Sequence, residues 1–485
     1  MIYEILNLPY NRIRRLLVQK EITPIDILRT FLKRAYKVNL LYNSYREIIE
    51  QSSFFQAILS QKRIINNRPL KLDSMIISVK DNICTRGIST TSCSKILKKF
   101  IPSYDSIIVK ILLRNGVIIL GKTNMDEFAI GAMSINSYFG SVVNPFHSSN
   151  LLKDLIIGGS SGGSACSVVY DSCVLALASD TGGSIRLPSS FSCLIGFKPT
   201  YGRISRNGII SFSNSLDQVG MLGKDLIDMS FVSECIVCND LKDIKCKNIL
   251  SYNYINNFKK SSNGFRIAIF TKYQKNYIHH EQTLFLVKLK KFLKISNCSC
   301  SEVFFPFTNY VLGVYYITTS LESASNFFFY DGIKYGANIK REDDFFKIIL
   351  NKIRSESLGV EIKKRLFLGA SLLSEKKFTN IYKKSLSIKK LITDFFQNVF
   401  LQFDIIITTS AFQLPFCYKK NKSLNKFCDN DVFNVIFNLV GLPCVFLPIA
   451  SDKNNLPLGL QIVSNYYCEH KLFQFTQIIK QQLFS

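Results

Sequence analysis

Two short turns of glycine and serine contain the residues whose types are best suited to catalysis. The first, Gly158–Ser164, has the sequence GGSSGGS, and the second, Thr181–Ser184, has TGGS and runs into Arg186 and Pro188. Glycines at this density allow close approaches that a Cβ would prevent, and they leave backbone N–H groups free to point at a ligand. We therefore interpret the stretch as an active site built on serine hydroxyls and backbone donors.

Two other interpretations of the first turn exist. Glycine and serine runs are typical of flexible linkers, but the flanking residues 155–157 and 168–169 are apolar. The pattern G-x-S-x-G at 158–162 also fits the nucleophile elbow of α/β-hydrolases, which needs an acid and then a histidine farther along the chain. The downstream histidines, at 279, 280 and 470, lie in no distinctive loop, and the elbow leaves the second turn unexplained.

Together with Ser78–Asn82 (SVKDN), the two turns resemble the amidase signature family, whose serine hydrolases use a Ser–Ser–Lys triad. By this resemblance Ser184 is the nucleophile, Ser160 the bridging serine after a cis peptide bond, and Lys80 the base. The residue types suit this chemistry, because a serine hydroxyl needs a neighbouring base, and a lysine serves as one only where burial lowers its pKa. The oxyanion hole is then expected from the N–H groups of Thr181, Gly182, Gly183 and Ser184.

Three other runs resemble one branch of the family, the glutamine-hydrolysing subunits of tRNA-dependent amidotransferases. They are GKTNMDEFAIG at 121–131, KPTYGRISR at 198–206 and SLDQVG at 215–220. The resemblance implies that glutamine supplies ammonia, that Glu-tRNA(Gln) is activated with ATP and Mg by a B subunit, and that a small C subunit usually joins the two. It leaves open whether Asp-tRNA(Asn) is served as well. This chain is expected to bind no cofactor and no metal, and its GKT at 121–123 lacks the glycine spacing of a phosphate loop.

A glutaminase must hold the α-amino and α-carboxylate groups of its substrate, which calls for an acid and an arginine. The resemblance assigns Asp431 to the amino group, Arg365 to the carboxylate and Tyr316 to the pocket wall. A register slip would replace Arg365 with Arg354 or Arg341. Each of these positions is in a predicted helix, where an exposed charge or a core aromatic is the ordinary explanation.

The chain departs from the family pattern at three places away from the triad. Phe329 stands where the family usually has an arginine, residues 74–76 replace an apolar-Pro motif, and the turn at 408–412 is shortened. Two other functions remain open. A free-standing hydrolase of another amide would keep the triad and need no partner, although the branch-specific runs argue against it. A catalytically silent scaffold or tRNA-binding subunit would be expected to lose a triad residue, and none is lost.

The elements that must position these residues are predicted from periodicity and turn signals. Helices are expected over 4–65, with one beginning at Thr23-Pro24, and a strand over Met75–Val79 is expected to end at Lys80. Further predictions are a helix over 103–113, a strand over 117–120, a strand over 265–270 and a helix over 281–293. This alternation predicts a largely parallel or mixed sheet with helices on its faces. The family resemblance implies the α/β amidase-signature fold, with a central mixed sheet and helices on both faces. We expect a single domain with N-terminal helices at about 1–65, a catalytic core at about 66–240 and a C-terminal substrate-pocket part at about 300–485.

Composition limits the remaining possibilities. Of the 485 residues, 47% are hydrophobic, which excludes a disordered chain. The formal net charge of +26 arises from 61 basic against 35 acidic residues. It indicates either the drift of an AT-rich genome or a face that meets RNA. The lysines that would form such a face are Lys288, Lys290, Lys291, Lys363, Lys364, Lys383, Lys384, Lys419, Lys420 and Lys422.

The fourteen cysteines are scattered, as in a reducing cytoplasm, and do not form a disulfide framework. Cys235, Cys238 and Cys246 are the one group that suggests zinc, and core cysteines are the favoured interpretation. The first residues lack a signal peptide, and no apolar run is long enough to cross a membrane. We therefore expect a cytoplasmic protein without membrane contact.

Overall fold

A computed structural model gives the conformation of the chain over the ranges that follow. The described residues are 4–146, 155–237, 239–247, 254, 258, 264–270, 280–331, 346–373, 375–408, 414–417, 431–452 and 454–484. None of the helices formed by these residues has the length and apolar content needed to span a bilayer.

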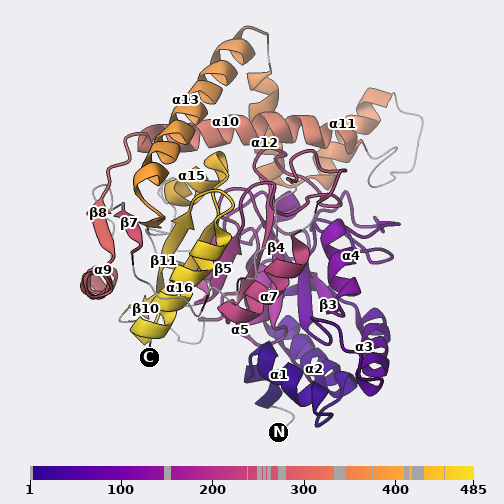
Figure 1. Ribbon diagram of the computed structural model, residues 1–485. Coiled ribbons are helices and arrows are strands. Elements are labelled where there is room, and N and C mark those ends of the chain that lie inside the picture. Colours follow the sequence, from indigo (N-terminus) through magenta and orange to yellow (C-terminus); the bar gives the residue numbers. More distant parts are fainter. Residues whose placement is uncertain are drawn as a thin grey trace.

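A mixed sheet of eleven strands forms the centre of the molecule (Figure 1). Strand β2 is parallel to β3 and β4, β7 is parallel to β8 and β9, and the other neighbouring pairs are antiparallel. The predicted mixed sheet is therefore confirmed. In sheet order the strands are β1 (Tyr45–Ile48), β3 (Ile118–Thr123), β2 (Ile76–Lys80), β4 (Leu175–Asp180), β6 (Gln218–Gly223), β5 (Ile195–Lys198), β10 (Cys444–Ser451), β11 (Pro457–Ser464), β9 (Ile405–Thr408), β7 (Arg266–Ile269) and β8 (Ser299–Glu302).

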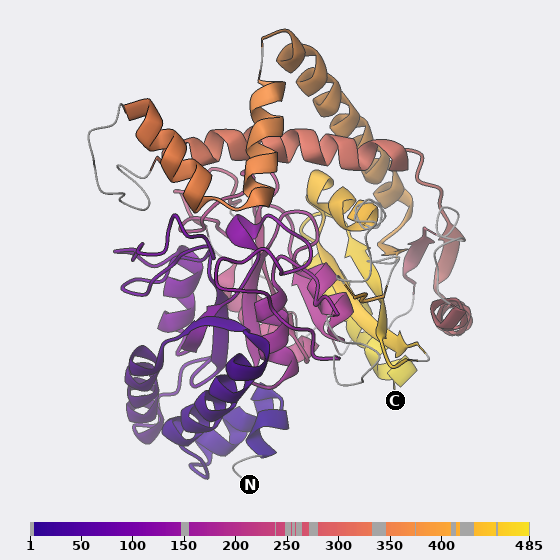
Figure 2. The ribbon, with the colours of Figure 1, turned by 180° about the vertical axis from the view of Figure 1, so that it is seen from behind.

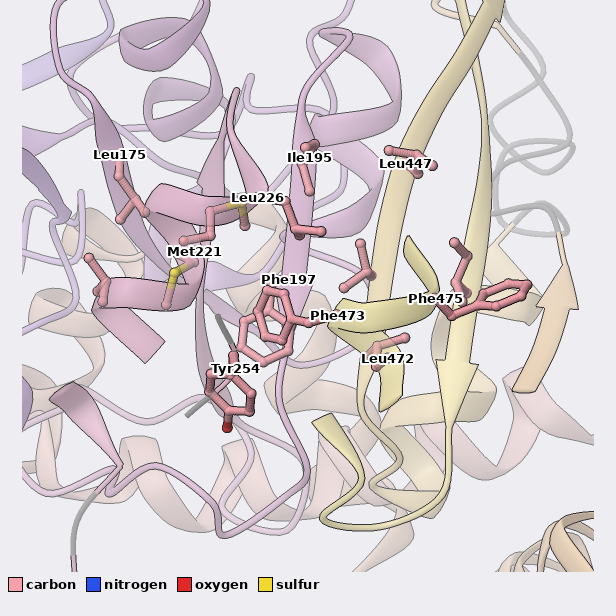
Figure 3. Close-up of a cluster of buried hydrophobic side chains, with 14 of the residues drawn as sticks. Leu175, Ile195, Phe197, Met221, Leu226, Tyr254, Leu447, Leu472, Phe473 and Phe475 are labelled. Carbon is pink, nitrogen blue, oxygen red and sulfur yellow. The ribbon is translucent and has the colours of Figure 1, made fainter. Parts of the chain in front are cut away.

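Helices cover both faces of this sheet. Successive residues of a strand point to opposite faces, and in β2 Ile77 and Val79 join one buried cluster while Ile76 joins another. The first cluster includes residues of α4 (Ile107–Arg114), α7 (Leu226–Ile236), α9 (His280–Ile295) and α16 (Glu469–Phe484). Figure 3 shows part of it, where Phe197 of β5 meets Phe473 of α16 with 4.7 Å between the ring centroids.

The opposite face is covered by two groups of helices. Residues of α2 (Pro24–Tyr42) and α5 (Gly162–Val169) pack there on the N-terminal half of the sheet. Residues of α10 (Thr308–Asn326), α13 (Glu375–Gln402) and α15 (Val432–Val440) pack on the C-terminal half. The helices predicted on both faces are thus confirmed.

The predicted N-terminal helices are present as η1 (Glu4–Asn7), α1 (Tyr10–Val18), α2 and α3 (Glu50–Ile65). They lie at the end of the molecule away from α10 and α13 (Figure 2). Thr23 begins α2 as expected, because its hydroxyl accepts a hydrogen bond from Asp26 N at 3.1 Å and the Asp26 carboxylate accepts one from Thr23 N.

The all-helical prediction for 4–65 is wrong at β1. These four residues pair antiparallel with β3 at the edge of the sheet. The Tyr45 hydroxyl lies 2.8 Å from Ser78 Oγ of β2, so the strand is fixed by residues that are distant in sequence. A strand this short leaves little alternation to recognise within a helical pattern.

The other predicted elements are close to the observed ones. Strand β2 ends at Lys80, the helix expected from 103 begins at Ile107 after the cap Ser106, and β7 and α9 occupy the predicted ranges. The remaining elements are η2 (Glu127–Ala129), α6 (Arg186–Phe191), η3 (Phe327–Phe329), α11 (Phe346–Ser357) and α12 (Val360–Leu372). Phe329, which stands where the family usually has an arginine, is exposed.

The cysteines within the described part of the chain are all free. Cys235 and Cys246 are half-buried, Cys238 lies outside the described residues, and the residues described contain no group of three or more His, Cys, Asp and Glu suited to a metal ion. The zinc interpretation therefore gains no support.

Candidate active site

Lys80 occupies a fully buried position at the end of β2. Its ammonium nitrogen Nζ donates to Ser160 Oγ at 2.8 Å, to Ser161 Oγ at 2.7 Å and to Ser179 Oγ at 3.1 Å. The structure thus brings together two of the three predicted triad residues. Ser161 and Ser179 are additional partners that the sequence did not indicate.

Burial lowers the pKa of Lys80 to about 7, because the charged amine loses its hydration in the protein interior. Asp126, Asp180 and Asp217 act in the opposite direction and keep the pKa from falling further. A lysine with this pKa is partly neutral near neutral pH, so Lys80 can accept a proton.

Ser160 follows a cis peptide bond from Gly159, as the family resemblance implied. Its turn is held by Ser134, whose hydroxyl donates to Gly158 O at 2.8 Å and accepts from Gly162 N at 2.9 Å. A Cβ on Gly159 would lie 2.3 Å from the Asp126 carboxylate, so only glycine fits between this turn and the neighbouring loop.

Ser184 belongs to the second turn, which Asp180 organises. The Asp180 carboxylate accepts hydrogen bonds from Gly183 N at 2.8 Å and from Ile185 N at 3.1 Å, and it pairs with Arg186. Both side chains of this pair are fully buried, and the Arg186 guanidinium also donates to Asn438 and Gln461. The turn therefore rests on a buried ion pair that fixes the residues on both sides of Ser184.

The predicted oxyanion donors differ in their availability. Gly183 N–H is already bonded to Asp180, and the Thr181 hydroxyl donates to Asp217 at 2.6 Å. Within the part of the chain that the structure describes, the backbone N–H groups of Thr181, Gly182 and Ser184 make no hydrogen bond, so these three are free for a ligand. The Ser184 hydroxyl likewise has no partner among the described residues, and no bond between Ser184 and Ser160 is present.

A cavity of about 370 Å³ opens over the second turn. Ser184 is 8% exposed and forms part of its wall. The three predicted substrate residues also line it, one from α10, one from α12 and one from the N-cap of α15. The residues of the wall are Ala129, Ile130, Gly131, Ala132, Met133, Ile135, Asn136, Gly159, Gly182, Gly183, Ser184, Leu187, Phe212, Leu312, Tyr315, Tyr316, Glu361, Lys364, Arg365, Asp431 and Val435.

Arg365, on α12, faces this cavity without a carboxylate partner among the described residues. Its guanidinium carbon lies 4.2 Å from the centroid of the Tyr316 ring, and its Nε is buried without a hydrogen bond. The alternative Arg354 instead donates to Phe327 O at 2.9 Å and does not line the cavity, and Arg341 lies outside the described residues. The register that places Arg365 in the pocket is therefore the observed one.

Asp431 stands at the N-cap of α15 but does not cap the helix with its side chain. Burial raises the pKa of its carboxyl to about 7, and Asn434 and Arg186 act to lower it. Because this carboxyl does not cap the helix and lines the cavity, it is available to bind a cationic group of a ligand.

The sequence did not indicate several residues of the site. Tyr315 closes one wall, since a Cβ on Gly182 would lie 2.6 Å from its hydroxyl. Glu361 and Lys364 line the cavity beside Arg365 and pair with each other at 2.7 Å. The spacing could have placed Glu361 with Arg365, because residues four apart share a helix face.

The lysines proposed as an RNA-binding face are only partly described. Lys288, Lys290 and Lys291 are exposed on α9, and Lys383 and Lys384 are exposed on α13. Lys419, Lys420 and Lys422 lie outside the described residues. An RNA contact through these lysines stays a prediction.

Comparison with known proteins adds independent findings. The model of the family described as Amidase matches residues 26–473. The A subunit of glutamyl-tRNA(Gln) amidotransferase from Ehrlichia canis (strain Jake) is 39% identical over 415 residues, 84% of each chain. The protein of the same name from Ehrlichia ruminantium (strain Welgevonden) is 35% identical over 483 residues, covering 99% of this chain and 98% of the relative.

A solved structure shows the same relationship at the level of the fold. The crystal structure of the A subunit of glutamyl-tRNA(Gln) amidotransferase from Thermotoga maritima aligns with a TM-score of 0.77 and 26% identity. The alignment covers 99% of this chain and 94% of that one.

Proposed function

This chain belongs to the amidase family, and we propose on that basis that it is the glutamine-hydrolysing A subunit of a glutamyl-tRNA(Gln) amidotransferase. The observation that carries the proposal is the cavity over Ser184. Arg365 and Asp431 are two of its charged residues, and neither forms an ion pair with another residue of the described chain. An amino acid amide carries the complementary carboxylate and ammonium groups.

In the proposed reaction Ser184 Oγ attacks the carbon of the glutamine side-chain amide. Ser160 passes the proton from Ser184 to the neutral amine of Lys80, which is 2.8 Å from Ser160 Oγ. The carbonyl oxygen becomes an anion, and the free N–H groups of Thr181, Gly182 and Ser184 are the donors available to stabilise it. The N–H group of Gly183, the other predicted donor, is already bonded to Asp180, and the Thr181 hydroxyl holds the turn through Asp217.

The tetrahedral intermediate then loses its nitrogen. Lys80 returns the proton through Ser160 to the leaving group, ammonia departs, and Ser184 keeps the γ-glutamyl group as an ester. A water molecule attacks this ester with Lys80 again as the base, which releases glutamate and restores the serine.

The pocket residues select the substrate by charge. Arg365 pairs with the α-carboxylate, while its stacking on Tyr316 fixes the plane of the guanidinium. Asp431 accepts the α-ammonium group on the other side of the cavity. A simple acyl amide has neither group and would leave both side chains unpaired.

The remaining steps are assigned to partner subunits. The ammonia passes to a B subunit, which activates Glu-tRNA(Gln), and Asp-tRNA(Asn) in complexes that serve it, with ATP and Mg. A small C subunit joins the two, and tRNA is bound through the complex. This chain itself uses no cofactor, and the free cysteines of its described part support the cytoplasm as its compartment.

The test measures ammonia release from glutamine by the wild-type chain and by Ser184→Ala, with and without the B and C subunits, ATP and Glu-tRNA(Gln). We expect release that requires Ser184 and increases in the assembled complex. Release from simple amides that is independent of the partners would support a free-standing amidase instead. Release that survives Ser184→Ala would reject the proposed nucleophile.

A further inference from the structure

Asp126 is a buried acidic residue beside the active site to which the proposed reaction assigns no role. It follows β3 and stands at the start of η2, and its side chain is fully buried. Each carboxylate oxygen accepts a backbone hydrogen bond, Oδ2 from Ser134 N at 2.9 Å and Oδ1 from Asn136 N at 3.0 Å. Two such donors favour the ionised form of the carboxyl. The Asp126 side chain therefore holds the backbone of the loop that follows η2.

This loop, residues 131–136, supplies a large part of the cavity wall. Five of its six residues line the cavity, namely Gly131, Ala132, Met133, Ile135 and Asn136. A Cβ on Gly131 would lie 2.4 Å from Asp126 Cγ, so the carboxylate packs directly against the loop as well as bonding to it. The shape of this side of the cavity therefore depends on Asp126.

Asp126 also contacts the turn that carries Ser160. Its backbone N–H donates to Ser160 O at 3.2 Å, and a Cβ on Gly159 would lie 2.3 Å from its Oδ2 atom. Ser134 adds a second connection, because its N–H donates to Asp126 while its hydroxyl bonds the backbone on both sides of Ser160. One buried side chain thus lies between the cavity wall and the turn of the bridging serine.

We propose that Asp126 is a positioning residue, whose carboxylate holds the cavity wall at 131–136 and the turn of Ser160 in a fixed position relative to each other. Because Asp126 is fully buried and does not line the cavity, it acts through these two segments and does not touch the substrate. A wall that shifted relative to the turn would change both the binding of glutamine and its alignment with the reacting groups. The inference rests on the proposed function and adds a residue that links substrate binding to proton transfer.

The negative charge of Asp126 gives this role a measurable consequence. Burial lowers the pKa of Lys80, and Asp126 is the acidic group that opposes this effect most strongly. Burial also raises the pKa of the Asp126 carboxyl, while its backbone donors and Lys80 act to lower it. The other titratable groups that act on Lys80 are Asp180, Asp217 and Cys93, and all three remain in the variants that follow.

The test uses Asp126→Asn in the complex with the B and C subunits, with glutamine hydrolysis measured from pH 5.5 to 9. Both partners of the carboxylate are backbone N–H donors, so the amide nitrogen cannot replace the oxygen that it displaces. We expect KM to rise about tenfold and kcat to fall at least about tenfold. The pH at which kcat is half-maximal should move below the wild-type value, because Lys80 loses an acid that favours its charged form.

Ser134→Ala separates the two connections. This variant keeps the backbone N–H that Asp126 accepts and removes the hydroxyl that bonds the turn of Ser160. We expect kcat to fall about tenfold and KM to change less than about twofold. The half-maximal pH should stay at the wild-type value, because no charge is removed.

Asp225→Asn is the matched control for the loss of a carboxylate. Asp225 likewise accepts two backbone hydrogen bonds, from Ile227 N and Asp228 N. It begins α7, which packs on the face of the sheet opposite α5, and it does not line the cavity. This variant should leave KM, kcat and the half-maximal pH unchanged.

The outcomes distinguish the inference from the proposed function. Unchanged KM, kcat and half-maximal pH in Asp126→Asn, in an active complex, would overturn the inference and leave the glutaminase assignment intact. A lower kcat with KM and the half-maximal pH unchanged would mean that Asp126 only supports the fold. A wild-type complex that releases no ammonia from glutamine would overturn the assignment and the inference with it.

Ser134→Ala decides the question if Asp126→Asn does not assemble into a folded complex. A fall in its kcat with KM retained would then support the connection between the wall and the turn. An unchanged kcat in this variant would overturn the inference.

Discussion

Lys80 and Ser160 are 80 positions apart in the chain, yet Lys80 Nζ lies 2.8 Å from Ser160 Oγ. The lysine ends a central strand and the serine begins the turn before α5, so the contact depends on the sheet and on a helix packed against it. This pair places a buried amine, whose pKa is lowered to about 7, within hydrogen-bond distance of the bridging serine.

The pH dependence of glutamine hydrolysis should follow the ionisation of Lys80. Burial lowers the pKa of this lysine to about 7, and only its neutral form can take the proton of the nucleophile. We therefore expect kcat to rise with pH and to reach half of its maximum near pH 7. Steady-state ammonia release between pH 5.5 and 9 measures this, and a rate that falls over the same range would contradict the assignment of Lys80 as the base.

Lys80→Arg provides the matching control for this profile. A guanidinium keeps a donor near Ser160 but does not become neutral in a protein. The variant should lose activity by at least about a hundredfold at every pH. Activity that recovers at alkaline pH would show that the profile has another origin.

Asp180→Asn should destabilise the fold strongly. The substitution leaves Arg186 buried without its carboxylate and weakens the hydrogen bonds of Gly183 and Ile185. Removing one partner of a buried ion pair costs about 3–5 kcal/mol. Urea unfolding followed by circular dichroism measures the loss.

The control for this substitution is Asp394→Asn, which breaks the exposed Lys390–Asp394 pair on α13. Exposed pairs contribute about 0–1 kcal/mol, so this variant should unfold close to the wild type. Similar losses in the two variants would mean that the buried pair does not stabilise the turn.

Glu127→Gln should weaken substrate binding. The Glu127 carboxylate accepts hydrogen bonds from Ser94 Oγ and from Gly359 N, at the start of the helix that carries Arg365. The amide of glutamine is uncharged, so its oxygen accepts the Gly359 N–H bond less strongly than the carboxylate does, and the tie between α12 and the core is weakened. We expect KM for glutamine to rise about three- to tenfold with kcat little changed.

Glu302→Gln is a suitable control, because Glu302 forms an exposed pair with Lys290 on the far edge of the sheet. It should leave both kinetic constants unchanged. A fall in kcat without a change in KM for Glu127→Gln would show that Glu127 acts on the catalytic turn and not on α12.

The tRNA interpretation of the basic residues predicts that Lys288, Lys290 and Lys291, when changed together to glutamate, reduce tRNA-dependent activity. Each phosphate contact that is lost should also flatten the dependence of tRNA affinity on salt. Glutaminase activity without tRNA serves as the internal control and should not change. Unaltered tRNA affinity of the assembled complex would favour genome composition as the origin of the charge.

The sequence by itself determined the chemistry of the site. The glycine and serine turns, Lys80 at a strand end and the alternation of strands with helices are local patterns, because turn conformation and periodicity depend on neighbouring residues. These patterns also place Ser184 directly after the two glycines that line the cavity. The boundaries of the elements that were predicted, such as the end of β2 at Lys80, followed from the same kind of local signal.

Only the tertiary structure decided which distant residues meet. Arg365 lines the cavity, whereas Arg354 bonds to the backbone of Phe327. Strand β1 forms because it pairs with β3. The Gly183 N–H group is bonded to Asp180 and is therefore not free for a ligand. Such features depend on burial and on contacts between elements far apart in sequence, which no local pattern of residues encodes.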